Sequence, residues 1–496
     1  MRVHLNIKTG LAVLGLGLGL SLITAQVMAA PASSGGTAIA IMQASAALQA
    51  GDCKAAKDPL NLLWHDPYLE QNDPSTAAQF RLQLIACTAQ LEGLPAALAL
   101  STENLTRAYD VNAYDFHVFL QLMASNTAGA ADTLDAGLTH FPGQAPNFSD
   151  MSVLGVLIAL QGNPERGQAL LNHLEETHWQ VHDLSANPLM GMLRLEGLRT
   201  AVRTADAPHA DLYRADLKTN ALFYILSQGD GNISRADVPA APVRPVLNGE
   251  IEAVKAVITA NPANLLALNY LMNLEQVNDQ NALALTQLGG ILDLVDQYGL
   301  DKFSSPESYP DLLTHKAELY ARTGNVIEAG KAYEAGATKL GAEKSNDILL
   351  SYMNFLVDRG QDQAGLAIKS RLYALDGAQA ATQVATEACA QGYLGDQAGF
   401  AASMAQLEGA DIMRIKPYLC AGDTDNAARA MIAAMANPDS RDTMIAFMQN
   451  GLPPISVSNR DDAFIAALLA LKKRPDVLAA AEASHIIIRQ WPVRLN

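Results

Sequence analysis

The sequence predicts an all-α fold in which helical hairpins stack side by side into an α-solenoid. The first observation is a turn made of Gly and a small polar residue that returns along the chain. It occurs at Gly51-Asp52, Gly162-Asn163, Gly324-Asn325, Gly360-Gln361, Gly395-Asp396 and Gly422-Asp423. The second is that small residues recur at fixed distances on both sides of these glycines. Repetition of this kind is typical of hairpins that bury their apolar faces only by packing on their neighbours.

Residues 1–30 have the layout of an export signal. Arg2 and Lys8 give a positive start, an apolar stretch runs over residues 11–23, and Val27-Met28-Ala29 offers a small-residue cleavage site. The apolar stretch is interrupted by glycines and is shorter than the roughly 20 residues that span a bilayer. We therefore expect a cleaved leader, a periplasmic or secreted location, and no stable membrane insertion after cleavage.

The composition excludes several classes of partner. The formal net charge is −17, and removing Arg2 and Lys8 with the leader changes it to −17 − 2 = −19. Nucleic acids and anionic lipid headgroups require basic surfaces, and the sequence shows no basic stripe. We expect neither as a partner.

Residues 31–185 are predicted to form an N-terminal helical-repeat domain, and 248–496 a C-terminal one. Seven positions before the turn glycines stand small residues, which are Ala44, Ala86, Gly155, Ala317 and Ala388. Five positions after them stand Ala56, Gly167, Ala329, Gly365 and Ala427. Small side chains at these places let paired helices approach closely. The glycine ends the first helix in a left-handed conformation, and the following Asp or Asn caps the second.

The repeat pattern stops over residues 186–247, which we expect to form an irregular joint between two superhelical segments. Residues 209–227 still have a helical pattern, but Pro239, Pro242 and Pro245 follow closely. Proline in a helix interior removes a hydrogen bond and clashes with the preceding turn. A second break at 451–459, which contains Pro453-Pro454, precedes a predicted terminal pair of helices.

The four cysteines form two groups with spacings of about one repeat. Cys53 and Cys87 are 34 residues apart, and Cys389 and Cys420 are 31 apart. An even number of cysteines in an oxidising compartment permits disulfides, and stacked hairpins bring equivalent helices together. We favour the pairs 53–87 and 389–420. The alternative is four buried thiols that pack as small apolar groups.

One unit resembles the tetratricopeptide repeat. Its residues are Leu313-x3-Ala317-x2-Tyr320-x3-Gly324-x4-Ala329-x3-Tyr333-x2-Gly336. The order of large, small, aromatic and turn positions is similar to the family pattern, although Gly341 stands where a proline is usual. The other units match it less well. The resemblance implies a binding scaffold and no reaction.

Two groups of residues are weak candidates for a metal site. Asp230, Asn232, Ser234 and Asp237 resemble the second half of a calcium-binding EF-hand loop, whose first and third ligand positions here hold Leu226 and Gln228. The alternative is a polar turn after a helix. His178 and His182, four residues apart, would share one face of a helix and could bind zinc. The alternative there is an ordinary solvated helix face.

The sequence contains no nucleophile elbow, phosphate-binding loop or His-Glu-x-x-His motif. We therefore expect no cofactor and a non-enzymatic scaffold that binds another protein or an extended peptide. Envelope assembly and exopolysaccharide or outer-membrane export are processes that use such scaffolds. The alternatives are a peptidoglycan-active enzyme, or its regulator, with a superhelical body, and a ligand- or metal-binding sensor.

Overall fold

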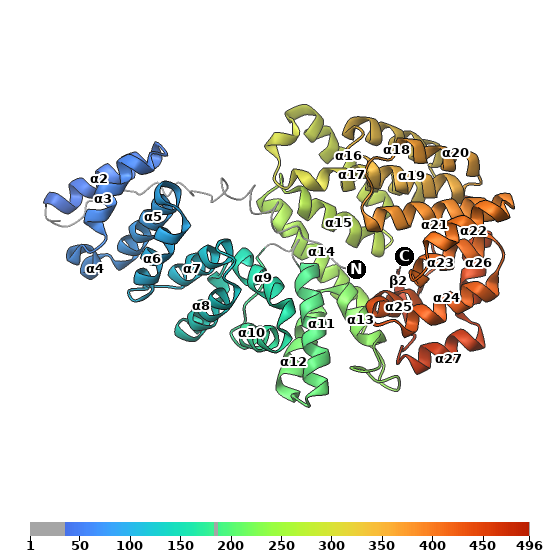
Figure 1. Ribbon diagram of the computed structural model, residues 1–496, viewed down its shortest axis with the longest axis horizontal. Coiled ribbons are helices and arrows are strands. Elements are labelled where there is room, and N and C mark those ends of the chain that lie inside the picture. The colour runs from blue at the N-terminus through green and yellow to red at the C-terminus, as the bar shows by residue number, and fades with distance from the viewer. Residues whose placement is uncertain (1–34, 183–186, 496) are drawn as a thin grey trace. The chain divides into compact units, whose positions relative to one another are not determined.

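The computed structural model describes residues 35–182 and 187–495, and these residues are almost entirely helical (Figure 1). The export signal expected over residues 1–30 lies outside the described residues. Contacts divide the chain into two units. We refer to residues 35–182 with 206–213 as the N-terminal unit, and to 187–205 with 214–495 as the C-terminal unit.

The N-terminal unit is a series of helical hairpins. Its helices are α2 (Gly35–Gln49), α3 (Cys53–Leu63), α4 (Pro67–Asn72), α5 (Pro74–Glu92), α6 (Leu94–Leu105), α7 (Asn112–Met123), α8 (Thr127–His140), α9 (Asp150–Ala159) and α10 (Pro164–Glu176). Sequential helices pack together, as α5 does on α6, and alternate helices also meet, as α3 does with α5. The division between the units crosses α12 (Ala207–Asp216).

The C-terminal unit continues the same construction over more hairpins. Its helices are α11 (Asn187–Arg203), α13 (Ala221–Gly229), α14 (Val243–Ala260), α15 (Leu265–Val277), α16 (Asn281–Tyr298), α17 (Tyr309–Arg322), α18 (Val326–Leu340), α19 (Asn346–Asp358), α20 (Asp362–Ile368), α21 (Gly377–Leu394), α22 (Gln397–Gln406), α23 (Asp411–Cys420), α24 (Thr424–Ala436), α25 (Arg441–Met448), α26 (Asn459–Lys472) and α27 (Pro475–Ala483). The prediction of an all-α, tetratricopeptide-like solenoid is confirmed.

The turn chemistry inferred from sequence is visible where α17 meets α18. Gly324 has a φ of +82°, its N–H donates to the carbonyl of Ala321, and the N–H of Asn325 donates to that of Tyr320. This pair of bonds is the Schellman arrangement that satisfies the last carbonyls of a helix. The turns at Gly51, Gly360, Gly395 and Gly422 have the same positive φ. Gly162 differs, because it ends a short 3₁₀ helix at Leu160–Gly162.

The small-residue positions lie at close helix contacts. Ala317 and Ala329 are fully buried in the core of the C-terminal unit. A Cβ atom on Gly336 would stand 2.4 Å from the Cδ1 atom of Ile348. Larger side chains at these places would force α17, α18 and α19 apart.

The segment expected to be an irregular joint is largely helical. Residues 187–229 form α11, α12 and α13, and the stretch without regular helix or strand is confined to about 230–242. Helix α14 begins at Val243, so Pro245 lies in its first turn. Proline is tolerated there because the first N–H groups of a helix have no partner inside the helix.

The last residues of the chain return to the start of the C-terminal unit. After α26 and α27, which are the two terminal helices expected from sequence, β2 (Gln490–Arg494) pairs in parallel with β1 (Asn450–Leu452). Strand β2 also contacts α14 and α15, and α25 contacts α13. Trp491 and Val493 are buried in the same core as Leu247 and Leu268. Figure 1 shows α25 and β2 beside α13.

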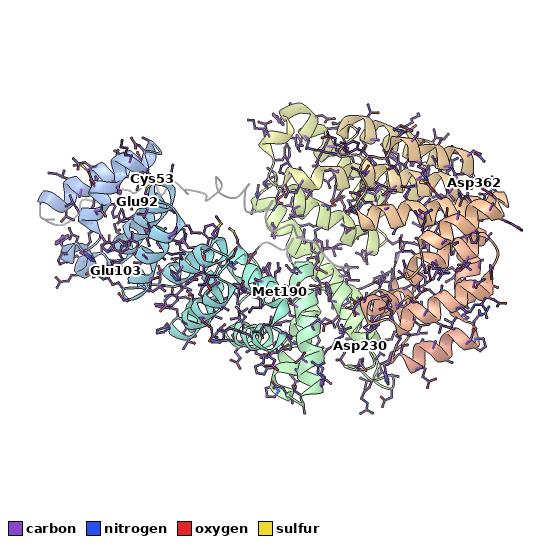
Figure 2. The ribbon with its side chains drawn as sticks, in the orientation of Figure 1. Cys53, Glu92, Glu103, Met190, Asp230 and Asp362 are labelled. Carbon is purple, nitrogen blue, oxygen red and sulfur yellow. A yellow bond between two sulfur atoms is a disulfide. The ribbon has the colours of Figure 1, made fainter. Side chains whose placement is uncertain are left out.

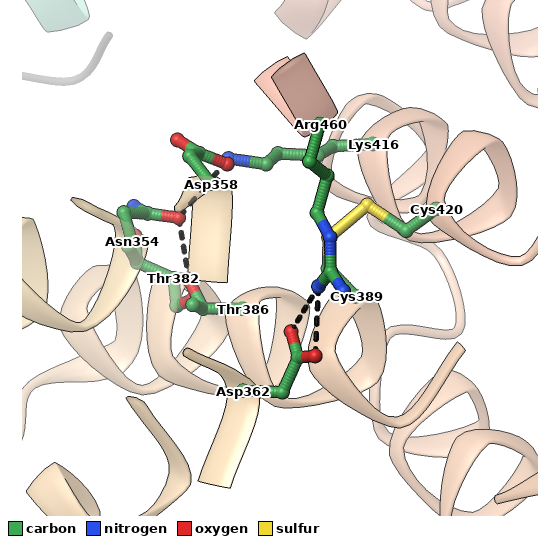
Figure 3. Close-up of a disulfide and its surroundings, with 9 residues drawn as sticks. All are labelled: Asn354, Asp358, Asp362, Thr382, Thr386, Cys389, Lys416, Cys420 and Arg460. Carbon is green, nitrogen blue, oxygen red and sulfur yellow. Dashed lines mark hydrogen bonds and ion pairs between the residues drawn. A yellow bond between two sulfur atoms is a disulfide. The ribbon is translucent and has the colours of Figure 1, made fainter. Parts of the chain in front are cut away.

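Both predicted disulfides are present. Cys53 of α3 is bonded to Cys87 of α5, and Cys389 of α21 to Cys420 of α23, with a Cα–Cα distance of 5.1 Å in each pair. Each bond therefore joins alternate helices of the solenoid. Cys53 is labelled on the N-terminal unit in Figure 2, and Figure 3 shows the second bond.

We expect Ala329→Leu to destabilise the C-terminal unit by about 1–3 kcal/mol, because it overpacks a filled helix contact. Ala335 is exposed on the same helix, so Ala335→Leu is the matched control and should leave the unfolding midpoint unchanged. Urea denaturation followed by circular dichroism measures both. Equal midpoints for the two variants would mean that Ala329 does not lie at a close contact.

The double substitution Cys389→Ala and Cys420→Ala should lower the free energy of unfolding by about 3 kcal/mol. The bond closes a loop with a sequence separation of 31 residues, and its loss restores conformational freedom to the unfolded chain. Non-reducing peptide mapping of the exported protein checks the pairing itself. Four alkylatable thiols, or a crosslink between the two groups, would contradict it.

Candidate functional site

The C-terminal unit has a cleft on one side of α17, α18 and α19. From the first two helices it is lined by Glu318, Ala321, Arg322 and Tyr333. From α19 it is lined by Ser351, Asn354, Phe355 and Asp358. Spacings of three, four and seven residues place side chains on a single face of a helix. The cleft therefore follows one stripe on each of two successive first helices, and we call it the inner cleft.

The opposite wall of the inner cleft comes from a distant part of the chain. It consists of Pro454, Ile455 and Val457, with Asp461 in the first turn of α26. The cavity has a volume of about 300 Å³, which is the lower end of the range for small-ligand sites. Apolar and charged groups thus face each other across a space large enough for a side chain or a short peptide segment.

Aromatic rings form the floor of the inner cleft. The ring centroids of Tyr333 and Phe355 are 5.4 Å apart, and Tyr352 stacks on Tyr333 at 5.2 Å. Burial raises the pKa of the Tyr333 hydroxyl, and the carboxylate of Glu318 adds to the shift. Tyr333 therefore remains neutral and serves as a rigid apolar surface with a hydroxyl at its tip.

The charged groups of the inner cleft are held by neighbouring helices. Lys416 of α23 donates to Asp358 at 2.9 Å and to Asn354 at 3.3 Å, and Thr386 of α21 donates to Asn354 at 3.0 Å. Figure 3 shows these contacts beside the Cys389–Cys420 disulfide. The polar wall is therefore fixed before any ligand binds.

The surroundings of Asp461 raise the pKa of its carboxyl group. Burial raises its pKa, and the nearby carboxylate of Asp358 contributes in the same direction, against the hydrogen bond that the Val457 N–H donates at 2.9 Å. The side chain thus links the cleft wall to the backbone of residue 457.

The repeat-packing residues predicted from sequence separate into two groups. Tyr333 lines the inner cleft, while Ala317 and Ala329 are buried behind it and Tyr320 packs half-buried at the edge of the same core. Gly324 forms the turn. The 454–461 wall was missed, since its only sequence feature is the Pro453-Pro454 break, which does not say where the segment lies.

The proposed calcium loop contains a buried ion-pair cluster. Asp230 is fully buried and accepts hydrogen bonds from Arg199 of α11 and Arg441 of α25, both at 2.8 Å. Arg199 also pairs with Asp442. The backbone N–H of Asn232 donates to Asp230 at 3.0 Å. Figure 2 labels Asp230 at this position.

The remaining members of that loop have other partners. Asp237 pairs with Arg235 at 2.6 Å in an exposed ion pair, and the Ser234 hydroxyl accepts from Arg489. The carboxylate of Asp230 thus faces two guanidinium groups, and the loop is bound to the C-terminal segment by arginines.

The two histidines predicted to share a helix face do not do so. Helix α10 ends at Glu176, and His178 has a φ of +58°, which is incompatible with a continuing helix. His182 instead pairs with Asp150, with 2.9 Å between Nδ1 and Oδ1. Trp179 between them is buried and donates from Nε1 to the carbonyl of Phe148 at 3.0 Å. The turn brings Trp179 into the core, which the sequence pattern of a polar helix did not show.

Metal binding and membrane crossing are the next two properties to consider for the described residues. Over residues 35–182 and 187–495, no three His, Cys, Asp or Glu side chains gather as a bound metal ion would require. In the same part of the chain, no helix combines the length and the apolar character needed to cross a bilayer.

Comparison with known proteins gives distant structural likenesses. No family model matches the sequence, and no curated protein matches it. The chain is similar to the crystal structure of the P58(IPK) TPR domain, with 15% identity over 88% of this chain and 99% of that chain, and a TM-score of 0.18. It is also similar to a circular tandem repeat protein with a novel repeat topology, with 13% identity over 90% of this chain and 96% of that chain, and a TM-score of 0.16. The assignment of a tetratricopeptide-like solenoid follows from the helices and turns described above.

Replacing Asp230 by Ala should lower the free energy of unfolding by about 3–5 kcal/mol, because two half-buried arginines would lose their shared, fully buried counter-charge. Asp237→Ala removes an exposed pair and should leave the unfolding midpoint unchanged. Urea denaturation at pH 7 compares the two variants.

The loss of stability caused by Asp230→Ala should depend on pH, and the direction follows from the pKa of Asp230. Burial alone would raise the pKa of Asp230, but Arg199 and Arg441 lower it overall. The stabilisation is therefore complete above the unfolded-state pKa of about 3.9 and is lost as the pH falls through the lower folded-state value. The difference between wild type and Asp230→Ala should shrink below about pH 4. A difference that grows on acidification would contradict the ion-pair assignment.

Proposed function

We propose that this chain is an exported, non-enzymatic scaffold that binds another protein, and that the inner cleft is a point of contact with its partner. The observation that carries the proposal is the inner cleft itself, because one stripe of side chains from α17 and one from α19 form its floor and a separate segment forms its wall. Solenoids commonly use such concave surfaces to bind extended segments.

The chemistry of the cleft suits a protein segment. Rigid aromatic rings provide apolar contact area, Asp358 and Asn354 provide polar groups that are held in place, and Ser351 adds a hydroxyl group. A few oriented polar groups on an apolar floor give specificity without chemistry on the ligand.

The expected location supports the same function. The sequence begins with the layout of an export signal, and both cysteine pairs form disulfides, which persist in oxidising compartments such as the periplasm. We infer a role in the bacterial envelope, in assembly or in the export of exopolysaccharide or outer-membrane components.

A photo-crosslinking residue at position 351 tests the proposal in cells that export the protein. Ser351 lines the inner cleft, while Thr338 is exposed on α18 and outside the cleft lining. We expect position 351 to give a discrete covalent adduct with one partner protein, and position 338 to give none. Adducts of the same pattern from both positions, or none from 351, would exclude the inner cleft as the contact point.

A further inference from the structure

The segment 453–458, which we call the strap, connects β1 to α26 and forms one wall of the inner cleft. Pro454, Ile455 and Val457 face the stripes of α17 and α19, which lie roughly 100 to 140 residues earlier in the chain. The segment 453–456 has no regular helix or strand. The strap therefore lies where an extended partner segment would lie on a helical-repeat surface.

The strap has the composition of an extended ligand. Its sequence is Pro-Pro-Ile-Ser-Val-Ser, so it carries no charged side chain, and its first two residues have no backbone N–H to satisfy. Ile455 and Val457 are half-buried, whereas Pro453 and Pro454 are exposed. Proline also limits the freedom of the segment in the unfolded and detached states, which lowers the entropic cost of binding it.

The ends of the strap are held by arginines and a serine. At the first end, Arg494 donates to the carbonyl of Pro453 and pairs with Asp279 at 2.8 Å. At the second end, the Ser458 hydroxyl donates to the carbonyl of Asp358 at 2.5 Å. Immediately after the strap, Arg460 binds both carboxylate oxygens of Asp362 at 2.6 and 2.7 Å and lies 4.3 Å from the centroid of the Tyr393 ring. Figure 3 shows Arg460 and Asp362 beside the disulfide.

The middle of the strap is held differently. In the described part of the chain, residues 454–456 form no hydrogen bond to α17 or α19, which they face across the inner cleft. Moving Pro454 and Ile455 outward would therefore leave intact the bonds from Arg494 to Pro453 and from Ser458 to Asp358 that fix the two ends.

We infer that the strap is a displaceable wall of the inner cleft, and that the partner replaces it with a segment of the same chemistry, extended, proline-containing and uncharged. This inference rests on the proposed function for the identity of the site. A resident segment competes at a high effective concentration, so a partner binds with an apparent affinity reduced by the fraction of time that the cleft is open.

The test uses a fluorescent peptide with the sequence of residues 450–459, Asn-Gly-Leu-Pro-Pro-Ile-Ser-Val-Ser-Asn. It is added to the full-length exported protein, to a strap variant carrying Pro454→Gly, Ile455→Gly and Val457→Gly, and to Arg460→Ala. Arg474→Ala is the matched control, because Arg474 forms exposed ion pairs with Asp425 and Asp476. We expect the strap variant to bind the peptide at least about tenfold more tightly than wild type, since its cleft is open more of the time. Arg460→Ala should be intermediate and Arg474→Ala unchanged.

Equal binding to all four proteins, or to none, would overturn the inference. Circular dichroism confirms that each variant is folded. If the strap variant does not fold, amide hydrogen exchange of the wild-type protein decides instead. The N–H group of Val457, which donates to Asp461 while the strap is in place, should then exchange at least about a hundredfold faster than those in the middle of α19, as local opening requires, and equal protection would overturn the inference.

The outcome is separable from that of the crosslinking experiment. Tight peptide binding by the strap variant, with no adduct at position 351, would support the strap as a displaceable wall and reject the inner cleft as the partner site. An adduct at position 351, with equal peptide binding by every variant, would do the reverse.

Discussion

The return of residues 485–495 to the helices that begin the C-terminal unit is the contact on which the inner cleft depends. Strand β2 lies against α14 and α15 and pairs with β1, and β1 leads directly into the strap. Gln449 fixes the junction, because its side-chain carbonyl accepts from Trp491 Nε1 and from the backbone N–H of Arg489, both at 3.1 Å. Without this closure, the 454–457 wall would have no fixed starting point. The cleft is thus a product of two parts of the chain that are distant in sequence.

Charged side chains fix the position of the C-terminal segment on the helices that it contacts. Arg489 donates to the carbonyl of Gln228 at the end of α13 and to those of Val238 and Arg235 in the irregular stretch, so one side chain satisfies three backbone groups. Asp230 does the converse, accepting from two arginines that come from α11 and α25. Apolar contact alone would tolerate a shift of the C-terminal segment along the core, whereas these directional bonds accept one register.

The parts of this structure that follow local rules could be predicted from the sequence. The turn at Gly324 and the buried Ala317 and Ala329 depend on neighbours within one hairpin, and the pairing of Cys389 with Cys420 depends on the spacing of one repeat. The ion-pair cluster at Asp230 could not be predicted and a calcium loop was expected instead, because its partners Arg199 and Arg441 lie 31 and 211 residues away in the sequence. The histidine pair required α10 to continue past Glu176, but burial of Trp179 turned the chain inward. The strap was recognised as a break in the helices, and its position on α17 and α19 is set by tertiary contacts that no periodicity encodes.

The closure also changes how stability is distributed between the end helices and the inner helices of the C-terminal unit. In a linear array each repeat contacts only its neighbours, so the two end repeats have one partner each and fray first. Here α13 and α14 have partners on both sides, since α25 and β2 lie against them. Fraying from either end of the unit would have to break the Asp230 cluster and remove Trp491 from the core together. The array is therefore closed on itself, and we expect its hairpins to unfold together rather than one after another from an end.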